Sequence, residues 1–260
     1  MKKRVETTNT PTSFQISILY EDASMVIIDK PFGIVVNRAE SVKGQTVQDW
    51  MDQKYQIPNF KSQISKPGTE ESINLTEFIS RSGVVHRLDK ETSGVLVLSK
   101  TPESFSYLKN QFKSREVIKK YKALVHGKVL PPEASINAPI GRLPWNRLRF
   151  GVFPDGRESM TNYRVEEYFT FSEEVLTLLS VTPHTGRTHQ IRVHLQYIGH
   201  PIVSDLLYAG RKRVRDDRTW CPRLFLHAYE LTIVSPATGE KHTFVSPLPI
   251  ELQTVLNKLS

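Results

Sequence analysis

The sequence predicts an α+β protein with one mixed, mostly antiparallel sheet and peripheral helices. Short apolar runs, bounded by turn residues and typical of strands, recur along the chain, whereas few stretches have helical spacing. No internal repeat and no clean linker divides the 260 residues, so we expect one large domain with its own core. We place this domain at 14–260, after a polar tail at 1–13 that we expect to be disordered.

The predicted strands share short apolar runs or a regular alternation of side chains. The clearest alternation places Tyr121, Ala123 and Val125 on the same side of one strand. The predicted strands lie at 16–20, 25–29, 95–99, 119–127, 161–167, 175–181, 225–234 and 243–246, and 34–36 is a candidate for another extended piece.

Three stretches have the spacing of a helix. One begins at Thr46, and a second begins at Thr101, which can cap the helix, with a proline in its first turn. The third spans 187–197, after a Thr-Gly turn. The remaining long segments are rich in Pro, Gly or polar residues, so we predict a flexible loop at 56–74 and irregular structure at 131–157.

The chain carries a large excess of positive charge. Its formal net charge is +8 and its pI is about 9.5, which favours an anionic partner such as nucleic acid. Cations interleaved with aromatic rings suit a single-stranded or flipped-out base, which offers both a phosphate and a stacking face. Three clusters raise this expectation: Lys113, Arg115, Lys119, Lys120 and Lys122; Arg142, Arg147 and Arg149 around Trp145 and Phe150; and Arg211, Lys212, Arg213, Arg215, Arg218 and Arg223 around Trp220.

Other classes of protein fit the sequence poorly. No apolar run approaches the roughly 20 residues that span a bilayer, and the basic N-terminus has no apolar core behind it, as a secretory signal would. Cys221 is the single cysteine, which excludes an internal disulfide and a multi-cysteine zinc site. We therefore expect a cytoplasmic protein, and a monomer, since a large domain needs no partner to fold.

One carboxylate stands out as a candidate reactive group. Asp89 lies between Arg87 and Lys90 on a polar, turn-rich segment directly ahead of the strand at 95–99. Neighbouring cations favour an ionised carboxylate, which can act as a nucleophile or a charge partner. An ordinary surface turn with local ion pairs is the alternative for this segment taken alone.

A second polar segment, at 184–194, holds three histidines and two arginines. The histidines His184, His189 and His194 are five residues apart, so on a helix successive side chains diverge by about 140°, whereas metal-binding pairs usually lie four apart. We therefore predict no metal site. Arg187 and Arg192 are better interpreted as partners for phosphate or a carboxylate. We expect Gly186 to open a helix whose N-terminus favours anions.

These segments together resemble one family. His86-Arg87-Leu88-Asp89 with Thr92-Ser93-Gly94 is similar to the signature of RluA-type pseudouridine synthases. Three further stretches resemble the same family in the same order: the opening strands through Lys30-Pro31, the strand that carries Tyr121, and the segment from Thr185 to His194 with Asp205. The ending from Leu226 to Pro249 also fits. The resemblance covers roughly 16–250, and four ordered motifs make it specific.

The resemblance implies an RNA pseudouridine synthase with a central RNA-binding cleft and no metal or organic cofactor. Asp89 would be the catalytic carboxylate that attacks the flipped nucleotide; whether attack or proton abstraction from the sugar comes first stays open. Tyr121 would stack on the uracil, and Arg192 would pair with Asp89 through its forked guanidinium. Arg87 would fill the space that the extruded base leaves. The other expected RNA contacts are His86, Thr92, Lys119, Arg187, His189, Arg142, Arg147, Arg149, Arg211, Lys212 and Arg213.

The sequence departs from many relatives at its beginning. Only about fifteen residues precede the first predicted strand, so we expect a stand-alone catalytic domain without the small N-terminal RNA-binding domain. The expected substrate is a structured or stem-loop RNA, ribosomal or transfer. Two other functions stay open: a catalytically silent RNA-binding protein of the same fold, and a glycosidic-bond hydrolase, which would need a second carboxylic acid.

Overall fold

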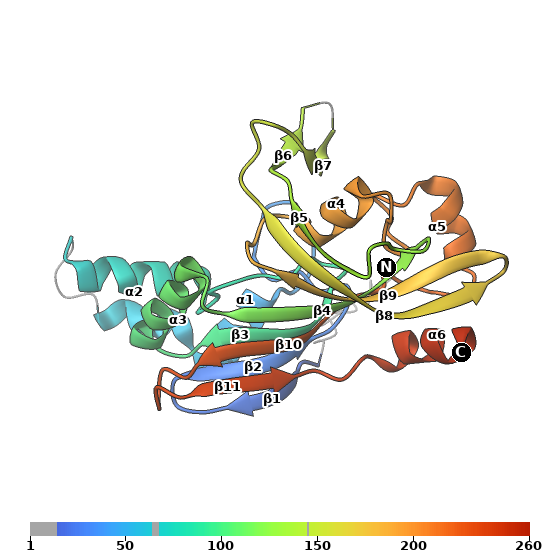
Figure 1. Cartoon of the computed structure of the whole chain (residues 1–260). Helices are drawn as coiled ribbons and strands as arrows, with labels where there is room; N and C mark the ends of the chain where they lie inside the picture. The colour runs from blue at the N-terminus through green and yellow to red at the C-terminus, as the bar shows by residue number, and fades with distance from the viewer. Residues whose placement is uncertain (1–14, 64–67, 145) are drawn as a thin grey trace, which may run out of the picture.

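A nine-stranded sheet runs through the protein, and a separate two-stranded hairpin stands above it (Figure 1). The structure is a computed structural model that describes residues 15–63, 68–144 and 146–260; the tail predicted at 1–13 lies outside this range. The sheet has the order β1-β2-β3-β10-β4-β9-β8-β5, with β11 paired to β10. Its strands are β1 (Ser17–Glu21), β2 (Met25–Lys30), β3 (Ser93–Ser99), β4 (Ile118–His126), β5 (Glu133–Asn137), β8 (Met160–Phe171), β9 (Glu174–Pro183), β10 (Leu226–Val234) and β11 (Lys241–Val245).

The predicted α+β class with a mostly antiparallel sheet is confirmed. Among the described strands, β3 and β10 form a parallel pair, and the other neighbours are antiparallel. The hairpin pairs β6 (Ile140–Leu143) with β7 (Asn146–Val152). No helix in the described part of the chain is long and apolar enough to cross a membrane.

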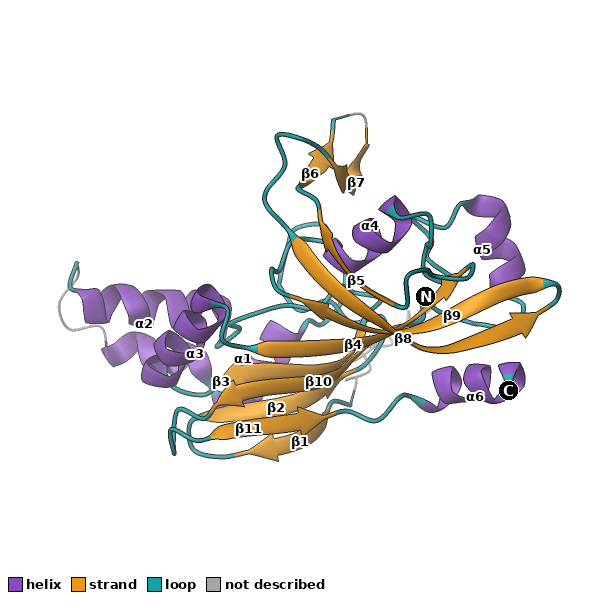
Figure 2. Cartoon of the chain, viewed as in Figure 1, coloured by secondary structure: helices purple, strands orange, loops and turns teal. Residues whose placement is uncertain are grey.

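The helices lie around the sheet rather than within it (Figure 2). α1 (Val47–Tyr55), α2 (Glu70–Arg81) and α3 (Pro102–Ser114) gather near one end of the sheet. α4 (Gln190–Tyr197) and α5 (Arg211–Asp217) lie toward the other end, and α6 (Ile250–Leu259) ends the chain. The predicted starts at Thr46 and Thr101 are confirmed, because both side chains accept a hydrogen bond from a backbone amide in the first turn of α1 and α3.

The middle of the sheet aligns residues from four strands in one row. Gly94 of β3 pairs with Ala228 of β10, Ala228 pairs with Tyr121 of β4, and Tyr121 pairs with Val181 of β9. The segment of Asp89 comes directly before β3, and the segment that leads into α4 comes directly after β9. The row therefore brings three segments that are distant in sequence to the same place above the sheet.

The prediction of a flexible loop at 56–74 is wrong for the described residues at each end of this segment. Residues Ile57–Gln63 form a 3₁₀ helix, in which Pro58 is tolerated because the first turn of a helix needs no amide donor. α2 begins at Glu70, since the Thr69 side chain accepts from the Ser72 amide and Leu75 and Phe78 are buried. The Pro and Gly signals marked the boundaries of these helices rather than one continuous loop.

Three other expectations need correction. Residues 34–36 form no strand. The segment 131–157 contains β5, β6 and β7, where paired backbone groups outweigh the many turn residues. The predicted helix from Arg187 starts later, at Gln190, because His189 has a left-handed backbone with a φ of 56°. Gly186 therefore does not open a helix.

The close approach of β3 to β10 predicts an intolerance to any side chain at Gly94. A Cβ atom there would lie 2.1 Å from the Ala228 carbonyl oxygen, and the φ of +118° is unfavourable for other residues. We expect Gly94→Ala to lower the free energy of unfolding by at least about 2 kcal/mol in chemical denaturation. Gly186→Ala is the control, since a Cβ atom at position 186 would meet nothing within 4 Å, and an equal loss in both variants would contradict the steric explanation.

Candidate active site

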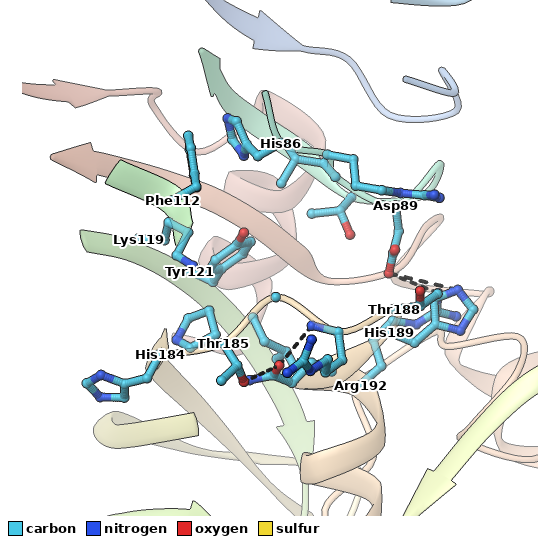
Figure 3. Close-up of a pocket in the computed structure, with 18 of the residues that line it drawn as sticks. His86, Asp89, Phe112, Lys119, Tyr121, His184, Thr185, Thr188, His189 and Arg192 are labelled. Carbon is cyan, nitrogen blue, oxygen red and sulfur yellow. Dashed lines mark hydrogen bonds and ion pairs between the residues drawn. The ribbon is translucent and has the colours of Figure 1, made fainter. Parts of the chain in front are cut away.

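A hollow above the central row of the sheet collects the three predicted catalytic residues. Asp89, Tyr121 and Arg192 all line it. Its volume of about 450 Å³ falls within the roughly 300–1,000 Å³ of typical ligand sites. Figure 3 shows His86, Phe112 and Lys119 grouped on one side, and Asp89 with Thr188 and His189 on the other. The walls thus combine aromatic rings with charged and hydrogen-bonding groups.

Asp89 takes its charge partners from a distant segment. Its Oδ2 atom lies 3.5 Å from Nη1 of Arg192 and 4.0 Å from Nε2 of His189. Its sequence neighbours Arg87 and Lys90, although described, form no ion pair with it. The expected effect of these two cations on Asp89 therefore does not come from a direct ion pair. The α4 region provides the positive charge instead.

Arg192 is held mainly by a carboxylate other than Asp89. Its Nε and Nη2 atoms donate to the two oxygens of Asp205 at 2.8 and 2.7 Å, and both side chains are almost fully buried. Burial alone would lower the pKa of Arg192, but the hydrogen bonds and charge of Asp205 outweigh it and raise that pKa. The predicted pairing with Asp89 is present as an ion pair, whereas the predicted two parallel hydrogen bonds are made to Asp205.

Tyr121 presents a neutral phenol to the hollow. β4 positions it next to Ala228, with a side chain that is 9% exposed. Burial raises the pKa of its hydroxyl, and the negative charge of Asp89 raises that pKa further. A planar, neutral ring at the wall of a hollow of this size can stack on a base.

A buried lysine supports the turn of Asp89. The Nζ atom of Lys30 donates to the carbonyl oxygens of Pro31 at 2.8 Å, Ile34 at 2.9 Å and Lys90 at 3.4 Å. Burial lowers the pKa of Lys30 to about 7, although the charge of Asp89 opposes this shift. No role was expected for this lysine from the sequence. The signal that could have indicated one is a lysine at the end of an apolar strand, before Pro31.

His86 lines the hollow but is not the cation that an RNA phosphate would require. Its Nε2 atom accepts a hydrogen bond from the Val97 amide at 3.1 Å, and its ring stacks on Phe112 at 4.4 Å. Burial lowers the pKa of His86 to about 3, so the ring is neutral near pH 7. Its contacts fix the turn against β3 and α3. In the structure His86 thus supports the hollow, and its expected contact with RNA stays a prediction.

The other expected RNA contacts divide into two groups. The hollow is also lined by Arg87, Thr92, Lys119, Arg187 and His189. The other expected cations whose side chains are described lie outside it. Arg142 and Arg149 belong to the β6–β7 hairpin. The Cζ atom of Arg142 lies 5.2 Å from the ring centroid of Phe150, and that of Arg149 lies 5.3 Å from the ring centroid of Tyr208. Arg211, Lys212 and Arg213 line a second hollow with Phe171 and Trp220. Arg147 belongs to β7, and Trp145 lies outside the described residues.

The three histidines of the 184–194 segment do not converge. His194 contacts Thr161 and the Ala138 carbonyl, His189 contacts Tyr208, and His184 is exposed. In the described ranges, no group of three or more His, Cys, Asp or Glu residues has the arrangement of a metal site. Of the three, only His194 lies on α4, so their separation follows from the path of the chain rather than from helical spacing.

Comparison with known proteins agrees with this arrangement. The model of a family described as RNA pseudouridylate synthase matches residues 24–197. A ribosomal large subunit pseudouridine synthase D from Nitrosomonas europaea is 39% identical over 248 residues, which cover 94% of this chain and 65% of that protein. An uncharacterized RNA pseudouridine synthase from Chloroflexus aurantiacus is 46% identical over 180 residues, which cover 69% of this chain and 54% of that protein. The chain thus spans less than two thirds of the length of these two relatives.

Solved structures share the fold. Human RNA pseudouridylate synthase domain containing 1 superposes with a TM-score of 0.68 and 25% identity, over 93% of this chain and 87% of that one. Human RNA pseudouridylate synthase domain containing 4 superposes with a TM-score of 0.67 over 94% of this chain, at 22% identity.

The buried pair of Arg192 and Asp205 predicts a large cost for removing one partner. We expect Asp205→Ala to lower the free energy of unfolding by on the order of 3 kcal/mol, because the buried guanidinium loses both of its hydrogen bonds. Chemical denaturation measures this loss. Asp216→Ala is the control, since Asp216 pairs with Arg215 at an exposed site, where we expect a change of less than about 0.5 kcal/mol. Similar losses in the two variants would contradict the importance of burial.

Proposed function

This chain belongs to the RNA pseudouridylate synthase family, and from that premise we propose that it isomerises uridine in RNA to pseudouridine. One observation carries the proposal: Asp89, the neutral phenol of Tyr121 and the guanidinium of Arg192 line the same hollow, although they come from three distant segments. A carboxylate, a stacking ring and a fixed cation are what this isomerisation requires. A catalytically silent RNA-binding protein would have no need of a reactive carboxylate at this place.

The proposed chemistry breaks one bond of the nucleotide and forms another. The bond between N1 of uracil and C1′ of ribose breaks, the base turns within the hollow, and a bond between C5 and C1′ forms. The proton on C5 leaves and N1 gains a proton, so the product is an isomer and no electrons are exchanged with a cofactor. Asp89 acts on the ribose, and Tyr121 keeps the detached base stacked while it turns. The reaction as proposed needs no metal or organic cofactor.

Arg192 suits this chemistry because it is fixed before substrate binds. Its two bonds to Asp205 hold the guanidinium, while Nη1 remains 3.5 Å from Asp89. A cation that is already oriented stabilises the carboxylate without reorganisation during the reaction. Arg87 lines the same hollow, which supports the proposal that it fills the gap that the flipped base leaves in the RNA.

A glycosidic-bond hydrolase is a less suitable function. Such an enzyme needs a second carboxylic acid as a proton donor beside the scissile bond. Glu91 is a candidate for this acid, since burial raises its pKa and so favours the protonated form. However, its carboxylate lies 3.7 Å from Nη2 of Arg192, and the residue does not line the hollow. Release of free uracil from RNA would favour the hydrolase.

We propose that the substrate is a structured ribosomal RNA of the large subunit. Transfer RNA is the alternative substrate, which mapping of pseudouridine in total RNA would reveal. The relative from Nitrosomonas europaea bears a ribosomal large subunit name, which supports this choice. We propose further that the enzyme acts in the cytoplasm and as a monomer. The exposed cations of α5 and the exposed Arg142 of the β6–β7 hairpin support contacts with RNA beyond the flipped base. Phe171 and Trp220, with ring centroids 4.9 Å apart, add aromatic surface beside the α5 cations.

Asp89→Asn tests the reaction. We expect the rate of isomerisation to fall at least about a thousandfold, because an amide cannot replace the carboxylate in the chemistry, while RNA affinity changes little. Pseudouridine is mapped site by site in total RNA from cells that carry the wild-type gene, the variant or no gene. Asp155→Asn, an exchange of the same kind in an exposed turn, is the control. An ordinary rate in Asp89→Asn would refute the role of Asp89, and an unchanged map without the gene would favour the silent RNA-binding protein.

The α5 cations predict salt-dependent RNA binding. We expect the triple variant Arg211→Gln, Lys212→Gln, Arg213→Gln to weaken binding of large-subunit ribosomal RNA and to reduce the slope of log K against log salt by about 2. The rate at saturating RNA should not change, since these residues lie outside the catalytic hollow. The control removes the same charge from exposed lysines elsewhere, Lys43→Gln, Lys241→Gln, Lys258→Gln. Equal weakening in both triple variants would show an effect of net charge alone.

A further inference from the structure

A continuous path of contacts leads from the β6–β7 hairpin to Asp89. The backbone amide of Phe150, in β7, donates to the Tyr208 hydroxyl oxygen at 3.0 Å. The same oxygen lies 2.9 Å from Nδ1 of His189, and Nε2 of His189 lies 4.0 Å from Oδ2 of Asp89. Three residues that are remote in sequence therefore connect the hairpin to the carboxylate.

The direction of each hydrogen bond follows from which atoms carry a proton and which can accept one. The Tyr208 oxygen accepts from Phe150, so its own proton needs an acceptor, because the side chain is 5% exposed. Nδ1 of His189 is the acceptor within reach. Burial lowers the pKa of His189, which favours a neutral ring with a single proton. That proton then resides on Nε2, the nitrogen that faces Asp89.

The ring of Tyr208 is held by contacts with both the hairpin and α4. Its ring packs against the guanidinium of Arg192 at 5.2 Å and that of Arg149, another hairpin residue, at 5.3 Å. It also packs with Ile140 and Val193 in a small apolar cluster that includes part of the hairpin. The ring is therefore anchored to β7 and to α4 at once, and its hydroxyl has little freedom to turn away from His189.

We propose that Tyr208 and His189 are positioning residues that link the β6–β7 hairpin to Asp89. The inference rests on the proposed function. Arg192 and His189, the latter oriented by Tyr208, both face the Oδ2 atom of Asp89 and together hold the carboxylate aimed at the ribose. Because the hairpin carries Arg142 and Arg149, RNA that engages the hairpin stabilises the same path that orients the carboxylate.

Tyr208→Phe tests the path, since it removes the hydroxyl and keeps the ring between its two guanidinium groups. The probe is large-subunit ribosomal RNA labelled with tritium at C5 of uracil, which releases tritium when C5 bonds to C1′. We expect kcat to fall between about 10- and 100-fold, as for a catalytic group displaced by up to 1 Å, with KM unchanged. Tyr163→Phe is the control, because this tyrosine is equally buried and its hydroxyl donates to Pro131.

Two substitutions of His189 test the reach of its ring. Asn tolerates the left-handed backbone of this position and retains a polar group where Nδ1 lies, but it does not extend to Nε2. We expect His189→Asn to lower kcat as Tyr208→Phe does, and His189→Gln, which extends as far as Nε2, to restore most of the rate. In the His189→Asn background, Tyr208→Phe should have no further effect on kcat.

The outcomes separate the path from the proposed function. Wild-type protein without tritium release on any RNA would refute the function itself. A wild-type rate in Tyr208→Phe, or independent losses in the double variant, would overturn the path while the function stands. Hydrogen exchange tests the hairpin end: the Phe150 amide should exchange faster in Tyr208→Phe, and unchanged exchange would remove the hairpin from the path.

Discussion

The parallel contact of β3 with β10 is the constraint on which the site depends. β10 lies between β3 and β4, so the turn of Asp89 and the ring of Tyr121 lie on the two sides of one strand. This arrangement requires glycine at position 94, where the Ala228 carbonyl occupies the space of a side chain. Because β9 continues the same row, the segment before α4 also reaches the hollow. Register in the sheet, rather than contact along the sequence, thus assembles the chemistry.

Charge within the hollow is arranged so that the proposed catalytic carboxylate is the least restrained one. Asp205 is fully buried and accepts both hydrogen bonds of the Arg192 fork. Asp89 is 19% exposed and has only longer contacts with Arg192 and His189. A buried cation with no partner would be costly, and Asp205 removes that cost without occupying Asp89. The carboxylate can then exchange its contact with Arg192 for one with the nucleotide.

Local sequence was informative wherever local interactions decide the structure. Thr46 and Thr101 were identified as helix starts because a capping side chain acts within its own turn. Tyr121 was placed on a strand by a two-residue alternation that the structure retains. The same reasoning failed at 56–74 and 131–157, where proline and glycine separate short elements instead of excluding them. Their pairing and packing partners are remote, and no local signal reveals them.

The sequence by itself determined the α+β class through its recurrent strand patterns, and its short motifs determined the family resemblance and the choice of Asp89, Tyr121 and Arg192 as candidates. Tertiary structure alone decided which groups contact one another. It paired the Arg192 fork with Asp205, gave Asp89 ion pairs with Arg192 and His189 rather than with Arg87 or Lys90, and buried Lys30 beneath the turn. It also made His86 a neutral support and joined Tyr208 to His189. The physical reason is that hydrogen bonds and burial depend on distances in space, which strand register sets and sequence spacing does not.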